Sequence, residues 1–405
     1  MTSRLIVNSI RHTGASADAI TLDNSGNATF PANVTCSGTA TGFGGRIQDN
    51  LIVNGAMNVA QRALSATGSG ANGYSTVDRF ALDQHGTDAY PSMAQADVAS
   101  GTTPYTLGFR KSLKITNGNQ SSGAGSSDRL AFEYKIEAQD MATSGWNYLS
   151  SSSYVTFTYW VKSSVAQNFY NTFTTDDGTS QRYVTETGSL SADTWTKITK
   201  TIPGNSNLTF NNDNEEGLGI TWELFRGTDQ TGTRPLNAWA ASANATRTPD
   251  QTSTWYTTNS ATFEITGVQL EVGSSSSDFQ HLSYADDLAK CQRYFYLLAD
   301  HDGQTHNACF GRGESLNSTS VAIQPYYPVT MRDAPSAVTT ATASPSFLAY
   351  EFNSYYHVTG NWNIHATSPQ TGQVYATTND MGGNNKPMRV QTDASVAKLG
   401  FDAEL

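Results

Sequence analysis

The fold is decided by one stretch of the sequence, 262-TFEITGVQLEVGSSSSDFQHLSYADDLAKCQRYFYLL-298. Its first half alternates apolar and polar residues, the pattern of a strand with one buried face. Phe263 and Ile265 share one parity, whereas Leu270 and its apolar neighbours two residues away on either side have the opposite parity. A β-bulge at Gly267 would turn both sets of apolar side chains to the same face of the sheet, because a bulge adds one residue and glycine tolerates its backbone geometry. The first half therefore predicts one bulged strand.

The second half of the stretch predicts a short helix. The serine run 274–277 ends the strand, and Ser283 can then cap a helix over 284–293. Asp286 stands three residues after Ser283, where a capping box places its second side chain. The narrow apolar face of this helix would be formed by Ala285, Leu288, Ala289 and Gln292. We expect the helix to act as a rigid joint between two β domains.

The residues before this joint, 46–283, show the period-2 pattern of a β-sandwich. Segments such as 129–137 and 154–163 place their large apolar side chains on one parity, which is typical of antiparallel sheets packed on one side. We predict a large jelly-roll-like sandwich here. Its nine predicted strands are 79-RFALD, 108-GFRKSLKIT, 129-RLAFEYKIE, 154-YVTFTYWVKSS, 167-QNFYNTFTT, 181-QRYVTET, 194-TWTKITKTI, 218-LGITWELFR and 261-ATFEITGVQLEV.

The residues after the joint, 294–405, predict a second, smaller β-sandwich. Prolines divide it into short segments. Its predicted strands are 294-YFYLL, 307-NACFGRG, 319-TSVAIQPYY, 347-FLAYEF and 388-MRVQT, with a last edge strand in 397-AKLGFDAEL. The fold class is thus all-β, two sandwiches linked by one helix.

Residues 1–45 have a different character. Their short apolar pieces, such as 5–7, 20–22, 28–30 and 34–36, are separated by turn residues and are too polar to bury a core alone. We expect this extended segment to become ordered by docking on other chains. It ends in a glycine-rich joint at 42–45.

Composition excludes several classes of function. The formal net charge is −11 and no basic run occurs, which argues against binding the phosphate backbone of nucleic acids. No apolar stretch approaches the roughly 18 residues of a membrane span, and residues 1–14 lack the apolar core of a signal peptide. The three cysteines, Cys36, Cys291 and Cys309, predict free thiols and assembly in a reducing cytoplasm, with Cys291 a small core residue.

Three phrases of the sequence occur in a recognisable order. They are 18-DAITLDNSGNATFPANVTCSGTATGFG, then 50-NLIVNGAMNVAQR with 73-GYSTVDRFAL, and then 265-ITGVQLEVGSSSSDFQHLSYADDLAKCQRYFY, with 399-LGFDAEL near the end. Together they resemble structural proteins of tailed bacteriophages, especially tail fibres and related virion appendages of marine phages. One departure is Leu282, where that family more often has a basic residue, so a salt bridge at this position is not carried over.

The resemblance implies a virion protein, usually a homotrimer, that attaches to other virion proteins through residues 1–45 and carries distal β-sandwiches resembling carbohydrate-binding modules. Its location would be the tail or particle surface, after assembly in the host cytoplasm. Contact with host surface polysaccharide is a secondary expectation. Two alternatives remain open: a capsid or tail decoration protein without a receptor, and a tailspike that depolymerises polysaccharide.

Aromatic residues in long loops are candidates for contacts with glycans or with other subunits, because flat rings can pack on sugar CH groups or on a partner protein. Each could equally pack in the core or cover the edge of a sandwich. The candidates are Trp239, Trp255 and Tyr256 in the large sandwich and Tyr326, Tyr327, Tyr355, Tyr356 and Trp362 in the C-terminal part.

Catalytic and metal chemistry has weak support in the sequence. Glycoside hydrolysis needs two carboxylates across a sugar site, and the candidates Glu133, Glu137, Glu223 and Glu264 are expected on solvated strand faces. No nucleophile motif is present, so we expect no enzyme activity. His301 and His306 are interpreted as a polar turn, and no metal or other cofactor is expected. A Ca²⁺ site in the acidic loop stays a weaker possibility, with ligands Asn211, Asp213 and Glu215.

Overall fold

The computed structural model describes most of the chain after residue 49 and scattered residues before it. The described residues are 7, 9–11, 13–14, 16–22, 24, 28–29, 50–301, 308–340, 347–383, 385–393 and 397–405. The chain divides into two compact units, Met1–Gln48 and Asp49–Leu405.

The first unit contains a small antiparallel sheet in the order β1–β2–β3. Its strands are β1 (Ser9–Ile10), β2 (Ile20–Leu22) and β3 (Ala28–Thr29). None of the residues described before Asn50 is buried, which agrees with the expectation that these pieces form no core of their own. The predicted pieces at 5–6 and 34–36 lie outside the described residues.

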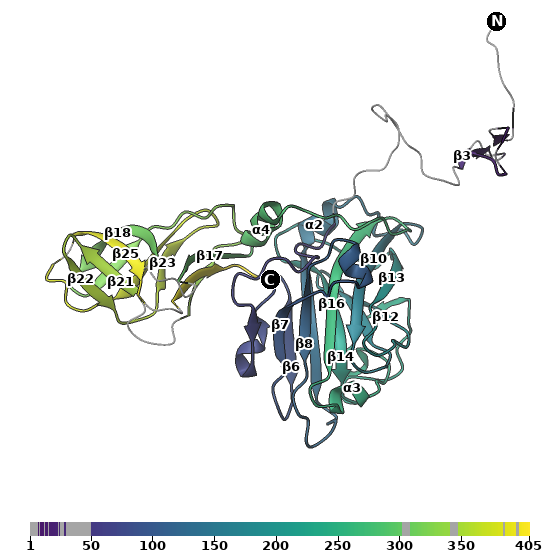
Figure 1. The fold of residues 1–405 in the computed structure, drawn as a ribbon, viewed down its shortest axis with the longest axis horizontal. Helices are drawn as coiled ribbons and strands as arrows, with labels where there is room; N and C mark the ends of the chain where they lie inside the picture. Colours follow the sequence, from purple (N-terminus) through teal and green to yellow (C-terminus); the bar gives the residue numbers. More distant parts are fainter. Residues whose placement is uncertain are drawn as a thin grey trace, which may run out of the picture. The chain divides into compact units, whose positions relative to one another are not determined.

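Two antiparallel sheets form the large sandwich (Figure 1). The six-stranded sheet has the order β13–β10–β16–β8–β7–β4, with bounds β4 (Ser65–Ala66), β7 (Ser92–Asp97), β8 (Lys111–Thr116), β10 (Tyr154–Ser163), β13 (Thr196–Pro203) and β16 (Thr262–Val272). The seven-stranded sheet has the order β15–β12–β11–β14–β9–β6–β5, with bounds β5 (Gly73–Tyr74), β6 (Ala81–His85), β9 (Arg129–Glu137), β11 (Tyr170–Thr175), β12 (Gln181–Glu186), β14 (Glu216–Arg226) and β15 (Trp239–Ala241). All nine predicted strands are present, and β4, β5, β7 and β15 are additional.

The core lies between these two sheets and follows the predicted parity. The alternate apolar residues of β9 and β10 are all buried: Leu130, Phe132, Tyr134, Ile136, Val155, Phe157, Tyr159 and Val161. Trp222 of β14 stacks on Phe132 with ring centroids 4.9 Å apart. Aromatic side chains therefore supply much of the apolar area that holds the sheets together.

The bulge predicted at Gly267 is confirmed. Strand β16 runs unbroken from Thr262 to Val272, and its pairing with β10 shifts register between Thr158 and Trp160. Gly267 has φ +64°, a conformation that glycine adopts at little cost. The shift lets Phe263 and Leu270, which differ in parity, both enter the core.

The predicted helix is α4 (Tyr284–Gln292), and the Ser283 side chain accepts a hydrogen bond from the Asp286 backbone N–H as expected. The prediction of its buried face is wrong, because Asp287 and Cys291 are buried while Ala285 is exposed. Asp287 turns inward because its carboxylate accepts the backbone N–H of Asn54 at 3.0 Å. The predicted core position of Cys291 is confirmed.

The other helical turns are short. They are α1 (Thr103–Thr106), α2 (Ala138–Thr143), α3 (Thr254–Thr257) and two 3₁₀ turns, η1 (Gly68–Ala71) and η2 (Asn244–Thr246). No helix in the described part of the chain is long and apolar enough to cross a membrane.

The smaller sandwich has a three-stranded and a seven-stranded sheet around its own core. The first has the order β17–β26–β20, with bounds β17 (Phe295–Asp300), β20 (Ser336–Thr340) and β26 (Lys398–Asp402). The second has the order β22–β21–β25–β18–β19–β24–β23, with bounds β18 (Cys309–Asn317), β19 (Ser320–Ile323), β21 (Phe347–Glu351), β22 (Ser354–Val358), β23 (Asn363–Thr367), β24 (Gly372–Thr377) and β25 (Pro387–Thr392). The prediction of a last edge strand is wrong, because β26 is central and hydrogen-bonds β17 on one side and β20 on the other.

Candidate functional site

The two most prominent aromatic candidates of the large sandwich are core residues. Trp255 and Tyr256 are fully buried, so neither ring presents a face to a ligand. The Trp255 indole N–H donates to the Thr262 carbonyl oxygen at 3.0 Å. The Tyr256 ring stacks on Phe225 at 4.3 Å, and burial raises the pKa of its hydroxyl. Their loop position suggested access to solvent, but helical turn α3 folds both rings inward.

Trp239 is half-buried on β15, an outer strand of the seven-stranded sheet. Its indole N–H donates to the Pro203 carbonyl oxygen at 2.7 Å, and its ring lies 5.3 Å from that of Tyr183. This placement corresponds to the alternative in which a ring covers the edge of the sandwich.

The C-terminal candidates separate into buried and exposed residues. Tyr327 and Trp362 are buried in the core of the smaller sandwich. Tyr326 is 72% exposed and Tyr355 is 56% exposed, whereas Tyr356 is half-buried. The structure therefore leaves Tyr326 and Tyr355 as the accessible rings of this set.

A largely buried joint is formed by Arg62, Asp78, Arg79, Glu137, Arg293, Tyr294 and Glu404, and all of these except Glu137 lie in the phrases that carry the family resemblance. Arg79 is fully buried and has φ +76°. Its guanidinium pairs with the Glu404 carboxylate, donates to the Lys135 carbonyl oxygen at 2.6 Å and lies 3.4 Å from the centre of the Tyr294 ring. Burial alone would lower the pKa of Arg79, but Glu404 and the neighbouring tyrosines together outweigh it and raise the pKa.

Arg62 and Asp78 extend the joint. The Arg62 guanidinium pairs with Asp402 at 2.9 Å and with Glu404 at 3.3 Å. The Asp78 carboxylate accepts the backbone N–H of Gln61 at 2.9 Å, and burial raises its pKa to about 6. These contacts fasten the end of β26 and the residues after it to the first loops of the large sandwich.

Glu137 closes the joint from the end of β9. Its carboxylate is buried and accepts hydrogen bonds from the Arg293 guanidinium at 2.6 and 2.7 Å and from the Tyr294 hydroxyl at 2.6 Å. Burial would raise the pKa of this carboxyl, but the hydrogen bonds from Arg293, Tyr294 and Gln139 and the charge of Arg293 together outweigh that effect and lower it. The joint is therefore a network of paired charges in a largely buried interface.

The expectation that the candidate acids lie on solvated strand faces is wrong for three of them. Glu137, Glu223 and Glu264 are buried. Glu223 pairs with Arg226 at 2.8 Å and Glu264 pairs with Lys162 at 3.0 Å. Alternating positions suggested exposure, but a carboxylate can be buried when a cation pairs with it.

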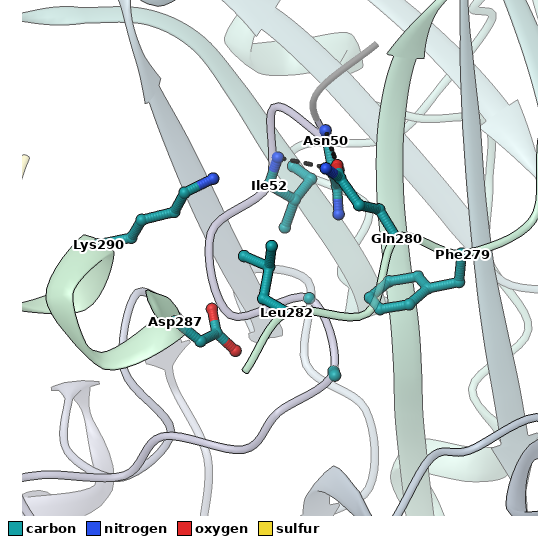
Figure 2. Close-up of a pocket in the computed structure, with 9 residues that line it drawn as sticks. Asn50, Ile52, Phe279, Gln280, Leu282, Asp287 and Lys290 are labelled. Carbon is teal, nitrogen blue, oxygen red and sulfur yellow. Dashed lines mark hydrogen bonds between the residues drawn. The ribbon is translucent and has the colours of Figure 1, made fainter. Parts of the chain in front are cut away.

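A small pocket of about 10 Å³ lies beside α4 (Figure 2). Asn50 lines this pocket. Its backbone N–H donates to the Gln280 side chain at 2.9 Å, and its side-chain amide donates to the Val268 carbonyl oxygen at 3.0 Å. Leu282, the departure from the family pattern, lines this pocket with Asp287 and Lys290. Because the pocket is no larger than a single water molecule, we interpret it as part of the packing of the joint.

A larger pocket of about 260 Å³ lies on the outer face of the six-stranded sheet, and we call it the aromatic pocket. The rings of Phe109, Phe279 and His281 form one wall, with centroids 4.9 Å apart in every pair. His281 Nε2 donates to the Leu107 carbonyl oxygen at 2.9 Å, which fixes the orientation of the imidazole. Trp160 of β10 also lines the pocket and is half-buried.

The bulge at Gly267 shapes the floor of the aromatic pocket. A Cβ atom at this position would lie 2.6 Å from Cζ of Phe109, well inside the contact distance of two carbon atoms. The ring of Phe109 therefore packs directly on the bulged backbone. One glycine serves both the register of β16 and the wall of the pocket.

The serine run folds back along the rim of the pocket. Its last residue, Ser277, donates from its hydroxyl to the Glu271 carboxylate at 2.6 Å, and its backbone N–H donates to the same carboxylate at 2.8 Å. This brings Ser277 and Asp278 to the pocket, which Thr158 and Lys197 of the sheet also line. Rings with a few hydrogen-bonding groups suit a ligand that has both CH faces and hydroxyls.

The aromatic pocket was missed by sequence reasoning. The available signal was Trp160, which stands on the polar parity of 154–163, between Thr158 and Lys162. A large ring on the outer face of a strand whose other face forms the core is a candidate contact residue. Phe279 and His281 lie in the segment that follows the serine run, where no periodicity predicts their approach to Phe109.

The predicted Ca²⁺ ligands Asn211 and Asp213 each bind a different partner. The Asn211 amide donates to Asp177 at 2.6 Å, and Asp213 accepts the backbone N–H of Glu215. Within the part of the chain that the structure describes, no group of three or more His, Cys, Asp and Glu side chains could hold a metal ion. His301 is buried and its Nδ1 lies 2.9 Å from the Thr392 hydroxyl, whereas His306 is outside the described residues.

Comparisons with known proteins give likenesses of fold at low similarity. The sequence matches no family model and no curated protein. Among solved structures, the enzymatically active domain of tailspike protein 4 of bacteriophage CBA120 is 11% identical, with a TM-score of 0.29 over 55% of this chain and 21% of that one. A family 4 carbohydrate-binding module is 12% identical, with a TM-score of 0.27 over 54% of this chain and 98% of the module. The N-terminal cellulose-binding domain of Cellulomonas fimi β-1,4-glucanase C is 10% identical, with a TM-score of 0.24 over 54% and 99%. Similarity this low assigns neither a family nor a function.

Proposed function

We propose that this protein is a structural component of a tailed-phage virion, a trimeric fibre or fibre-like appendage whose large sandwich contacts glycans of the host surface. The aromatic pocket is the observation that carries the glycan contact. It combines Trp160 and the Phe109–Phe279–His281 wall with Lys197 and Asp278, in about 260 Å³ on the face of a sheet. The virion assignment is supported by the phrases at 18–44, 50–82 and 265–296.

The chemistry of the pocket favours binding over hydrolysis. A glycosidase needs two carboxyl groups separated by about 5 to 9.5 Å across the sugar. Asp278 is the one carboxylate among the residues that line the pocket. The nearby acids Glu264 and Glu271 are buried and bound to Lys162 and Ser277, respectively. We therefore propose a non-catalytic contact and keep the depolymerase as an alternative that the same assay detects.

The glycan contact is tested by binding of the full chain to a panel of host surface polysaccharides, with Trp160→Ala as the diagnostic variant. We expect the variant to lose at least about tenfold in affinity, or about 1.4 kcal/mol, because a stacked ring is removed. Trp239→Ala is the matched control, since it removes a half-buried tryptophan of the same sandwich outside the pocket. Wild-type protein that binds no polysaccharide, or unchanged binding by Trp160→Ala, contradicts the proposal, and release of reducing ends supports the depolymerase.

The virion assignment has a separate test. Antibody against this chain should label the tail or surface of purified particles in electron micrographs, and the purified chain should have the mass of a trimer in light scattering. A chain without residues 1–45 should stay folded and bind glycans but fail to join the particle. Absence of the protein from purified particles would reject this half of the proposal and leave the glycan contact standing.

A further inference from the structure

We infer that the outer face of the seven-stranded sheet in the smaller sandwich binds an acidic polysaccharide through a pair of arginines. The site lies outside the aromatic pocket and takes a different, anionic class of ligand. It shares with the proposed function the premise that the protein contacts glycans. Its centre is Arg312 of β18 and Arg389 of β25, which are direct cross-strand partners.

The two arginines form a pairing that folding alone does not favour. Both are exposed, and residues directly opposite on antiparallel strands have Cβ atoms about 5 Å apart, so like charges there destabilise the sheet. Among the described residues, no carboxylate lies within the 4.0 Å of an ion pair from either guanidinium. In a chain of net charge −11, two unneutralised cations side by side point to an anionic ligand.

Two tyrosines continue the row on one side. Tyr350 of β21 is the partner of Arg389, and Tyr355 of β22 is the partner of Tyr350. The Arg389 guanidinium lies 4.8 Å from the centre of the Tyr350 ring, and the two tyrosine rings are 5.7 Å apart. Tyr355 is 56% exposed at the outer strand of the sheet. The row of Tyr355, Tyr350, Arg389 and Arg312 crosses four adjacent strands, which is about 14 Å.

A polar groove continues the row on the other side. Gln324 directly follows β19, and the pairing of Gly313 with Ile323 puts it at the register position opposite Arg312. Gln324 and Gln373 line an open groove of about 400 Å³ whose other residues, Thr367 and Ser368 among them, are all uncharged. Amides and hydroxyls of this kind suit sugar hydroxyl groups.

The composition of the row identifies the ligand as a polysaccharide with carboxylate or sulfate groups. A guanidinium fork binds such oxyanions by paired hydrogen bonds, and the tyrosine rings offer faces to sugar CH groups. A nucleic acid is disfavoured, because phosphate-backbone binding draws on a longer series of cations than these two.

The test uses the full chain and three probes in affinity gel electrophoresis: polygalacturonate, sulfated dextran and neutral dextran. We expect the first two to retard the protein, and the double variant Arg312→Gln/Arg389→Gln to lose at least about tenfold in affinity for them. The same variant should melt at an unchanged or higher temperature, because the repulsion between the arginines is gone. The matched control Arg110→Gln/Lys290→Gln removes the same charge from exposed positions elsewhere and should bind as wild type does.

The outcomes separate this inference from the aromatic pocket. Loss of acidic-polysaccharide binding in the arginine variant but not in Trp160→Ala supports a second site. Unchanged binding in the arginine variant, no binding by the wild type, or equal retardation by double-stranded DNA of matched charge overturns it. Retention of neutral glycans by the arginine variant shows that failure of this site leaves the proposed function intact.

Discussion

Replacing Glu404 by glutamine should open the buried joint. The side chains of Arg79 and Glu404 are 0% and 4% exposed, and they pair with each other inside the interface. Removing one partner of a buried ion pair costs about 3 to 5 kcal/mol, because the remaining charge is left without compensation in a dry environment. Arg79 keeps the Lys135 carbonyl and the Tyr294 ring, but neither carries an opposite charge. We therefore expect Glu404→Gln to lower the free energy of unfolding by about 3 to 5 kcal/mol.

The assay is equilibrium unfolding in urea, followed by tryptophan fluorescence. Glu215→Gln is the control, because the Glu215 side chain is 67% exposed and lies 3.5 Å from Arg332. An exposed pair of this kind contributes under about 1 kcal/mol. Limited proteolysis should also cut Glu404→Gln between 273 and 294 more readily than wild type. If Glu404→Gln lowers the free energy of unfolding no more than Glu215→Gln does, the idea that paired buried charges hold the two sandwiches together is refuted.

Three further predictions address the bulge, the joint and a hairpin tip. Gly267→Ala should lower the free energy of unfolding by roughly 2 kcal/mol or more, because it adds backbone strain at φ +64° and a clash with Phe109. The control Gly188→Ala has a similar φ of +72° but open space around it, so it should lower this free energy by only about 1 kcal/mol. Equal losses for the two variants in urea unfolding would exclude the clash. Burial raises the pKa of Asp78 from 3.8 to about 6, so its proton binds more tightly in the folded state. The free energy of unfolding of wild type minus that of Asp78→Asn should therefore rise by up to about 3 kcal/mol as pH falls from 7 to 4. A difference that falls over this pH range contradicts the prediction. Phe352 is 95% exposed and has φ +50° in the turn between β21 and β22. Phe352→Gly should therefore leave the stability measured by thermal unfolding unchanged or raise it by up to about 1 kcal/mol. A clear loss of stability would indicate that this ring makes a contact within the chain.

The strands of the large sandwich were predictable because their periodicity survives in the folded state. The alternation of apolar and polar residues in 129–137 and 154–161 correctly predicts which side chains are buried in the core, and the shift of this alternation at Gly267 predicts the bulge. The strands that were missed are short, such as β4 and β5, or polar, such as β7 and β22. Short or polar segments pair because neighbouring strands supply hydrogen-bonding partners, and a single sequence does not state which strands are neighbours.

The site was less predictable, because exposure depends on tertiary contacts. Trp255 and Tyr256 lie in a long loop, yet one helical turn buries both rings. Glu137 and Glu264 alternate with apolar residues, yet paired cations make their burial possible. For residues in loops, distance in sequence says little about which rings or charges they meet.

Most of the charged residues of the joint lie in the phrases that make the sequence recognisable. The Asn54 backbone N–H binds Asp287 of α4, and the guanidinium groups of Arg62 and Arg79 pair with acids at the C-terminal end of the chain, so these groups serve the joint. Under the proposed function, ligand choice is encoded elsewhere, on strand positions that face away from both cores. Trp160 on β10 and Arg389 on β25 are such positions, since each lies on the outer face of its sheet. Two proteins that share the joint phrases but differ at these outer positions should therefore keep the same fold and bind different glycans.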